Sequence, residues 1–314
     1  MPQPFNTSEI PIVALVGPTA SGKTALSLDL ASALHGEIVN TDAMQVYRGM
    51  DIGTAKLPLA ERRGIPHHLL DTLEIRDVAT VSDFQAWARA AIADLRARAV
   101  TPVLVGGSGL YTRVILDQFD FPGTDVVVRE RLEAELDQVG AVAMNARLRV
   151  LDPVAADRIG DNGRRIVRAL EVIELTGEPW SARLPVQEYA DPHTVQIGVS
   201  IDPAILEERI RQRVQEMFDE GFVAEVEELL DRGLADGRTA RVAIGYRQVM
   251  AALAGEMSLE EAQERTFTAT RKFSRKQMAW WKADPRITWV EYDDPDRVAK
   301  ALAAVRKIGQ APGS

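Results

Sequence analysis

The residues with the clearest chemical potential form one short segment near the start of the chain, Gly17-Pro18-Thr19-Ala20-Ser21-Gly22-Lys23-Thr24. A glycine, four spacer residues and then Gly-Lys-Thr allow successive backbone N–H groups to surround phosphate oxygens, and Lys23 adds a positive charge. The Thr24 hydroxyl is of the type that binds Mg²⁺ beside such phosphates. The pattern therefore predicts a phosphate-binding loop at residues 17–24, in preference to an ordinary glycine turn before a helix.

The elements around this loop have the order that a phosphate loop requires. The apolar run 12–16 predicts a strand before it, and the stretch 23–35 predicts a helix after it. Three further strand-like runs follow, at residues 36–42, 66–71 and 102–105. Before the last of them, a long helix is expected from a Ser82 cap to about Ala99.

This alternation predicts an α/β protein with a doubly wound parallel sheet flanked by helices, of the P-loop NTPase-like kind. Ligands of such sheets lie at the carboxyl ends of the strands. Four residues of interest stand at such ends, namely Gly17, Asp42, Asp71 and Gly106. We therefore expect them to lie along one edge of the sheet.

The pattern changes at about residue 119, where helical periodicity and several arginines replace the strand-like runs. We interpret residues 119–192 as a helical insertion, and residues 1–118 with 193–314 as the catalytic core. Strand-like runs resume at 195–201 and 287–290. Between them, Asp202 with Pro203 is predicted to begin one helix, and Ser258 to begin another.

The second of these helices carries a basic face. From Arg265 to Lys282 it has six basic residues and no acidic one, although the whole chain is acidic. Its spacing predicts a core face of Ala262, Thr266, Ala269, Phe273 and Trp280, and an outer face of Arg271, Arg275 and Lys282. A concentrated positive face on an acidic protein indicates a nucleic-acid contact.

Composition narrows the classes of protein. The chain of 314 residues has a net charge of −9 and no cysteine, which excludes disulfides, thiolate zinc sites and cysteine nucleophiles. A metal would therefore be bound through oxygen or imidazole, and Mg²⁺ fits the loop. The negative charge argues against a protein that coats nucleic acid. With neither a signal sequence nor a membrane-spanning run, we expect a cytoplasmic protein.

The phosphate loop alone does not determine the reaction. Kinases and hydrolases of this loop class need a second carboxylate on Mg²⁺ at a strand end, but the run 103–105 ends in glycines. On the residues alone, Asp42 could be a general base, a Mg²⁺ ligand or a capping residue. The arginines of the run 163–172 could equally be a solvated basic face.

Longer motifs indicate a family. The chain resembles the tRNA dimethylallyltransferases in an ordered series of segments: residues 17–24, 42–56, 64–68, 105–111, 168–172, 244–248 and 271–281. This resemblance implies transfer of a dimethylallyl group from dimethylallyl diphosphate to N6 of adenine 37, beside the tRNA anticodon. The phosphate loop would then bind a departing diphosphate with Mg²⁺ and would not present a γ-phosphoryl group.

The resemblance also implies roles for particular residues. The diphosphate would lie on residues 17–24, with Lys23, Thr24 and Arg213 acting on it and with Thr24 on the metal. Asp42 would be the general base that removes a proton from the adenine amino group. The residues implied in tRNA binding are Asp42, Ala43, Met44, Gln45, Ser108, Arg129, Gly163, Arg164, Arg165, Ile166 and Val167. From their place on the basic helix, we add Arg271 and Arg275.

Three alternatives remain open at this point. A small-molecule kinase would use the same loop, and an adenylate-type isopentenyltransferase would use free AMP as the acceptor. A non-enzymatic RNA-binding module would leave the loop unexplained. The partners we expect are the tRNA anticodon stem-loop and dimethylallyl diphosphate, bound by a monomer without a membrane contact.

Overall fold

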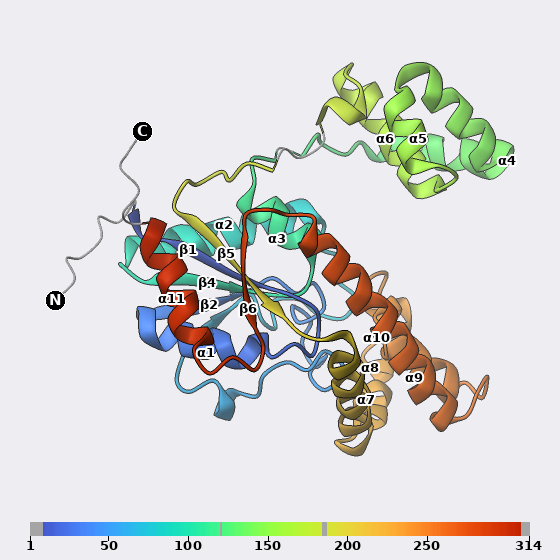
Figure 1. Cartoon of the computed structure of the whole chain (residues 1–314). Coiled ribbons are helices and arrows are strands. Elements are labelled where there is room, and N and C mark those ends of the chain that lie inside the picture. Colours follow the sequence, from blue (N-terminus) through green and yellow to red (C-terminus); the bar gives the residue numbers. More distant parts are fainter. Residues whose placement is uncertain (1–8, 120, 184–186, 309–314) are drawn as a thin grey trace. The chain divides into compact units, whose positions relative to one another are not determined.

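The computed structural model describes residues 9–119, 121–183 and 187–308, and its chain divides into two compact units. Unit 1 comprises residues 1–116 and 191–314, and unit 2 comprises residues 117–190. The unit that interrupts the chain thus begins and ends two residues before the insertion that the sequence suggests. Figure 1 shows the helices and strands that make up each unit.

Unit 1 is built on a six-stranded sheet in the order β3-β2-β4-β1-β5-β6, and every pairing is parallel. The strands are β1 (Ile12–Val16), β2 (Gly36–Asn40), β3 (His67–His68), β4 (Thr101–Val105), β5 (Thr194–Ser200) and β6 (Ile287–Glu291). Strand β1 lies between β4 and β5 and is fully buried. The predicted parallel α/β sheet is therefore confirmed, and it places the residue after β1 at the centre of its carboxyl edge.

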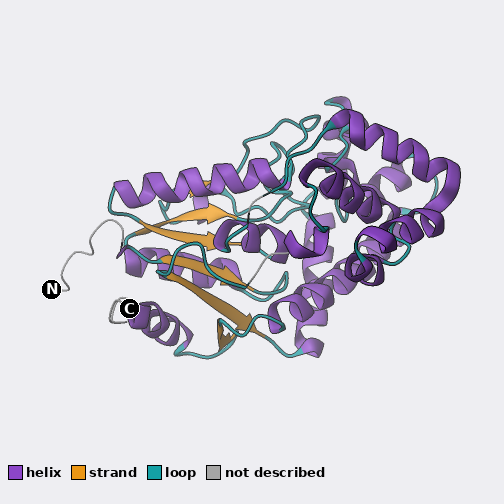
Figure 2. Ribbon diagram, turned by 90° about the horizontal axis from the view of Figure 1, so that it is seen from above, coloured by secondary structure: helices purple, strands orange, loops and turns teal. Residues whose placement is uncertain are grey.

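Helices cover both faces of this sheet (Figure 2). Helix α1 (Lys23–Leu34) packs with α11 (Arg297–Ile308), and α2 (Val81–Ala97) packs with α3 (Gly109–Leu116). The main core joins α1 and α11 to the strands through residues such as Leu15, Leu30 and Ile197, none of which is exposed. This apolar layer fixes where each strand ends.

The remaining helices of unit 1 form a group after β5 (Figure 1). They are α7 (Pro203–Asp219), α8 (Phe222–Asp231), α9 (Tyr246–Leu253) and α10 (Leu259–Lys282), with 3₁₀ turns at Leu234–Asp236 and Ala240–Val242. Helix α10 packs on α7 and α9, and it also touches α3. Asp202 and Ser258 cap α7 and α10 as predicted. Among the described residues, the structure contains no helix with the length and apolar character needed to span a membrane.

Three local predictions are wrong. Helix α2 is capped by Thr80, whose hydroxyl accepts from Asp83 N, and not by Ser82. The third strand covers only His67–His68, within the predicted 66–71. On α10, Phe273 and Trp280 are each 42% exposed, whereas Phe267 and Trp281 are buried. The buried stripe of α10 includes the polar Ser274 and Gln277, which hydrogen bond within the protein, so counting apolar residues gave the wrong phase.

Unit 2 is helical, as its periodicity indicates. Its elements are α4 (Val126–Leu151), interrupted at Gly140, then α5 (Pro153–Ile159), α6 (Gly163–Thr176) and a 3₁₀ turn at Trp180–Arg183. An antiparallel bridge joins Asp117 to Tyr189 near its two ends. A separate core includes Leu132, Met144, Ile166 and Leu170. Unit 2 therefore has apolar packing of its own.

Candidate active site

The phosphate loop connects β1 to α1 at the centre of the sheet edge. Gly17 and Gly22 have φ values of +144° and +88°, which side chains rarely adopt. A Cβ atom on Gly17 would lie 3.1 Å from the Val199 carbonyl oxygen, so the loop passes close to β5. Within the described part of the chain, the buried Ser21 hydroxyl has no hydrogen-bond partner. These features suit a loop that receives an oxygen-rich ligand.

Gln277 of α10 connects the phosphate loop to the loop after β4. Its Oε1 accepts from Thr19 N at 3.0 Å, and its Nε2 donates to the Gly107 carbonyl at 2.9 Å. A Cβ atom on Gly107 would lie 2.3 Å from that Nε2, so a side chain there would displace the Gln277 amide. Sequence reasoning missed Gln277, because its partners lie 258 and 170 residues away. The basic helix thus contributes a buried side chain to the phosphate loop.

Asp42 follows β2 and is fixed by local hydrogen bonds. Its Oδ1 accepts from Met44 N at 2.8 Å, and its own N–H donates to Asn40 Oδ1 at 2.9 Å. The Asn40 amide also donates to the Asp42 and Leu69 carbonyls. The Asp42 side chain is therefore held on a turn at the same sheet edge as the phosphate loop.

Electrostatics relate Lys23, Asp42 and Arg213. Burial, together with the charge of Arg213, lowers the pKa of Lys23 to about 7, and Asp42 opposes the shift. Burial also lowers the pKa of Arg213, again opposed by Asp42. Lys23 Nζ donates to the Pro18 carbonyl at 2.5 Å. Two cations and one carboxylate predicted from separate parts of the sequence thus influence one another, and an added anion would relieve the repulsion between the cations.

A second arginine of α7 also reaches the loop. Arg209 Nε donates to the Ala20 carbonyl at 2.8 Å, and its guanidinium carbon lies 5.6 Å from the centre of the Tyr292 ring. Ala20 has a φ of +61°, an unusual value for a residue with a side chain. The contact stabilises this strained turn and adds positive charge beside the phosphate loop.

The other residues implied in tRNA binding within unit 1 occupy different settings. Ala43, Met44 and Gln45 are half-buried, and the Gln45 amide donates to the Thr54 carbonyl at 3.1 Å. Ser108 is half-buried just before α3. These residues follow β2 and β4, and therefore share the edge of the sheet that carries the phosphate loop.

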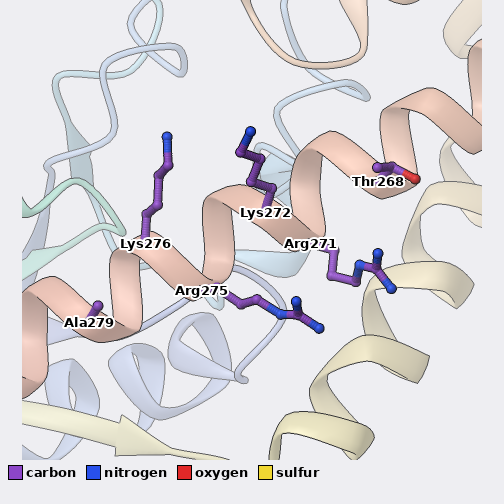
Figure 3. A pocket seen from close by; sticks show the side chains of 6 residues that line it. All are labelled: Thr268, Arg271, Lys272, Arg275, Lys276 and Ala279. Atoms are coloured by element: carbon purple, nitrogen blue, oxygen red, sulfur yellow. The ribbon is translucent and has the colours of Figure 1, made fainter.

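Four basic side chains in the middle of α10 point in two different directions (Figure 3). Arg271 and Arg275 point toward α7, where Glu207 accepts from them at 2.8 and 3.4 Å. Lys272 and Lys276 point away on the other side of the helix. An open pocket runs along this part of the helix, lined by Thr268, Arg271, Lys272, Arg275, Lys276 and Ala279. The predicted Arg271 and Arg275 are thus partly neutralised, while the two lysines face outward.

In unit 2, the residues implied in tRNA binding also differ in burial and in ion pairing. Arg129 donates to the buried Glu171 at 2.7 Å, as does Arg168. The side chains of Ile166 and Val167 lie in the core. Arg164 and Arg165 are exposed at the start of α6. Only these two of the five residues 163–167 present long charged side chains to solvent.

No protein cage for a metal is present among the described residues, where no three His, Cys, Asp or Glu side chains cluster suitably. Thr24 is exposed at the first turn of α1. Mg²⁺ commonly uses one or two protein oxygens together with substrate phosphates and waters. A hydroxyl from Thr24 beside a phosphate loop fits that kind of site.

Sheet topology and the loop after β1 define an α/β protein of the P-loop class with an edge suited to an anionic ligand. The family model "IPP transferase" matches residues 45–284. A tRNA dimethylallyltransferase of Nocardioides sp. is 68% identical, with 94% of this chain and 96% of that protein aligned. The chain therefore belongs to the IPP transferase family.

Solved structures agree with this assignment. The tRNA isopentenylpyrophosphate transferase of Bacillus halodurans is 38% identical, with a TM-score of 0.70 and 96% of both chains covered. A eukaryotic dimethylallyltransferase acting on tRNA is 25% identical, with a TM-score of 0.78 over 93% of this chain and 77% of that one. The similarity thus extends over both units of the chain.

Proposed function

We propose that this chain is a tRNA dimethylallyltransferase, which transfers the dimethylallyl group of dimethylallyl diphosphate to N6 of adenine 37 in tRNA. The observation that carries the proposal is the grouping of Lys23, Arg213 and Asp42 beside the phosphate loop of an IPP transferase family member. This grouping supplies positive charge for a leaving diphosphate and a carboxylate for a proton, which are the two needs of the reaction.

Departure of diphosphate is the first need. The bond between the allylic carbon and the diphosphate oxygen breaks, and its electron pair stays on that oxygen. Lys23, Arg213 and the loop N–H groups stabilise this charge more strongly in the transition state than in the bound substrate. The Ser21 hydroxyl, buried without a partner in the described chain, is a further donor of the right kind.

Removal of a proton is the second need. The adenine amino nitrogen is a poor nucleophile, because its lone pair is delocalised into the ring. As the new N–C bond forms, Asp42 accepts one N6 proton, and a general base of this type commonly contributes about 10²- to 10⁴-fold. The Asn40 and Met44 contacts hold the Asp42 carboxylate ready for this step.

We further propose that the Thr24 hydroxyl would hold Mg²⁺ when dimethylallyl diphosphate is bound. When bound, the ion would neutralise part of the leaving-group charge.

For the tRNA, we propose recognition of the anticodon stem-loop by a monomer. Removal of adenine 37 from its stack costs a few kcal/mol, so contacts with the rest of the loop and stem must compensate. The exposed Arg164 and Arg165 of α6, and the basic side chains of α10, are suited to phosphate contacts.

One assay tests the proposal directly. The protein is incubated with Mg²⁺, labelled dimethylallyl diphosphate and unmodified tRNA, with AMP and ATP present as competing acceptors. Label in tRNA, lost when adenine 37 is replaced by guanine, is the expected result. Label in AMP but not in tRNA would identify an adenylate-type isopentenyltransferase instead. Sedimentation at the assay concentration checks the monomer.

A further inference from the structure

Two of the motifs that resemble the family, residues 42–56 and 244–248, contact each other through Gly53 and Tyr246. The proposed reaction does not use this contact. The segment Asp51–Lys56, which we name the 51–56 segment, follows the residues 42–45 that are implied in tRNA binding. It packs against α8 and α9, where Gly53 lies beside Phe222 and Tyr246. A Cβ atom on Gly53 would lie 2.2 Å from the Phe222 ring and 2.6 Å from the Tyr246 ring. Glycine is therefore required at this contact.

One carboxylate binds the first half of the 51–56 segment. Glu225 of α8 accepts from Asp51 N at 3.0 Å and Ile52 N at 2.6 Å through Oε2, and from Gly53 N at 3.2 Å through Oε1. The buried Tyr246 hydroxyl donates to Oε1 at 2.6 Å. Three consecutive backbone N–H groups around one carboxylate fix the backbone firmly, because hydrogen bonds to an ionised acceptor are strong.

The far end of the segment is fixed as well. Lys56 Nζ, on a side chain only 3% exposed, donates to the Tyr47 carbonyl at 2.9 Å. It also pairs with Asp51 and Asp71 at 2.6 Å each. Both ends of the 51–56 segment are thereby held, which determines where the two carbonyls between them point.

Those two carbonyls orient Gln45. The Gln45 Nε2 donates to the Thr54 carbonyl at 3.1 Å and lies 3.5 Å from the Ala55 carbonyl. Since both neighbours are acceptors, the NH₂ group must face them, and the amide cannot flip. Its Oε1 is left to accept a hydrogen bond from an amino group such as that of adenine.

We propose that Glu225 is a positioning residue of the transfer reaction, which acts through the 51–56 segment to hold the Gln45 amide in its adenine-accepting orientation. The inference rests on the proposed function, because it takes the adenine of the tRNA as the ligand of Gln45. Glu225 belongs to α8 and lies outside every motif quoted from the sequence. The inference explains why it nevertheless binds the backbone of the motif 42–56. Displacement of a binding group by about 1 Å can cost about 10²-fold in rate.

The test is a double-mutant cycle with Glu225→Gln and Gln45→Ala. Glu225→Gln turns an NH₂ group toward backbone N–H donors and so releases the segment. We expect kcat/KM for tRNA to fall about 10- to 100-fold in each single variant, by analogy with other displaced groups. The double variant should be no worse than Gln45→Ala alone. The Kd of dimethylallyl diphosphate should stay within about threefold in all three.

Controls separate positioning from folding. Glu227→Gln alters an exposed carboxylate of the same helix and should leave kcat/KM unchanged. Tyr246→Phe removes only one donor to Glu225, and should lower kcat/KM by about threefold to tenfold even if Glu225→Gln fails to fold.

Three results would overturn the inference. If the losses in kcat/KM of the two single variants multiply in the double variant, Glu225 does not act through Gln45. A parallel loss of affinity for dimethylallyl diphosphate would indicate general structural damage. Equal kcat/KM values for the Glu225→Gln and Glu227→Gln variants would show that Glu225 has no positioning role. Failure of the unaltered protein to modify tRNA would instead overturn the proposed function, and the inference with it.

Discussion

The phosphate-loop edge and the helical unit 2 each place two cations around one carboxylate, yet in opposite arrangements. In unit 2, Glu171 is completely buried and forms ion pairs of 2.7 Å with Arg129 and Arg168. Both arginines remain partly exposed, at 37% and 29% of their side chains. A buried carboxylate with outward cations is satisfied internally, as structural ion pairs are.

At the phosphate-loop edge the burial is reversed. Lys23 is buried and Asp42 is half-buried, and no ion pair among the described residues joins Asp42 to Lys23 or to Arg213. Burial lowers the pKa values of both cations; repulsion by Arg213 adds to the shift of Lys23, and repulsion by Arg209 adds to that of Arg213. The comparison teaches that charge counts do not distinguish a structural cluster from a ligand site, whereas the identity of the buried group does: a cation, Lys23, at the phosphate loop and a carboxylate, Glu171, in unit 2.

Among the substitutions that test this contrast between the two clusters, Asp42→Asn is expected to have the largest effect. The amide keeps an acceptor for Met44 N but cannot take the adenine proton, so kcat should fall by about 10²- to 10⁴-fold. Single-turnover measurements with saturating tRNA check this, and the Kd for tRNA should remain within about threefold. Asp94→Asn, on the surface of α2, is the control. Normal turnover of the Asp42 variant would refute the base assignment.

The sequence predicted one of these regions far better than the other. The phosphate loop is encoded locally by eight residues, and Asp42 follows from the rule that parallel strands end at one edge. Arg213 could be assigned only by family resemblance. The roles of Gln277 and Glu225 were not predictable, because each binds backbone groups at least 170 residues away in sequence.

Unit 2 illustrates the limit in another way. Periodicity correctly indicated its helices, and the structure buries Ile166 and Leu170 in their core. It could not separate Arg168, which binds Glu171, from Arg164 and Arg165, which are exposed, since all three read as basic residues of one helix. Whether a charge is paired depends on tertiary packing, and no local pattern records it.

A second prediction concerns the stability of unit 2. Glu171→Ala leaves two arginines without their shared partner, and the Asp125 N–H without its acceptor. Because the arginines can turn to solvent, we expect a loss of about 2–3 kcal/mol in unfolding free energy. Hydrogen exchange resolved over residues 121–183 measures it. Glu174→Ala, which breaks an exposed pair with Arg131, should cost less than about 0.5 kcal/mol. Equal losses of unfolding free energy in the two variants would contradict the distinction between the buried Glu171 pairs and the exposed Glu174 pair.

A third prediction uses the lowered pKa of Lys23, which is about 7. Bound diphosphate favours the charged lysine and raises its pKa, so binding above pH 7 takes up a proton. The contribution of Lys23 to affinity is therefore complete below pH 7 and declines by about tenfold per pH unit above it. Calorimetry at pH 6 to 9, in buffers of different ionisation enthalpy, measures the uptake.

The matched control for that titration is Lys23→Met. The diphosphate has titrating groups of its own, but they contribute equally to both proteins, so the difference between the two curves reports Lys23 alone. We expect the uptake attributable to Lys23 to rise toward about one proton per site at pH 8.5. A difference that does not vary with pH would show that Lys23 stays charged in the free protein, and would remove the electrostatic contrast with unit 2.

The smallest effect is expected from the exposed arginines of α6. Arg164→Ala and Arg165→Ala should each weaken tRNA binding by about threefold to tenfold, and each should reduce the slope of log K against log salt by about 0.7–0.9 if one phosphate contact is lost. Filter binding between 50 and 300 mM salt measures both quantities. Arg131→Ala removes an equal charge from the same unit, but one already paired with Glu174. If it weakened binding as much as the α6 variants, pairing would not determine which arginines of unit 2 are available to RNA.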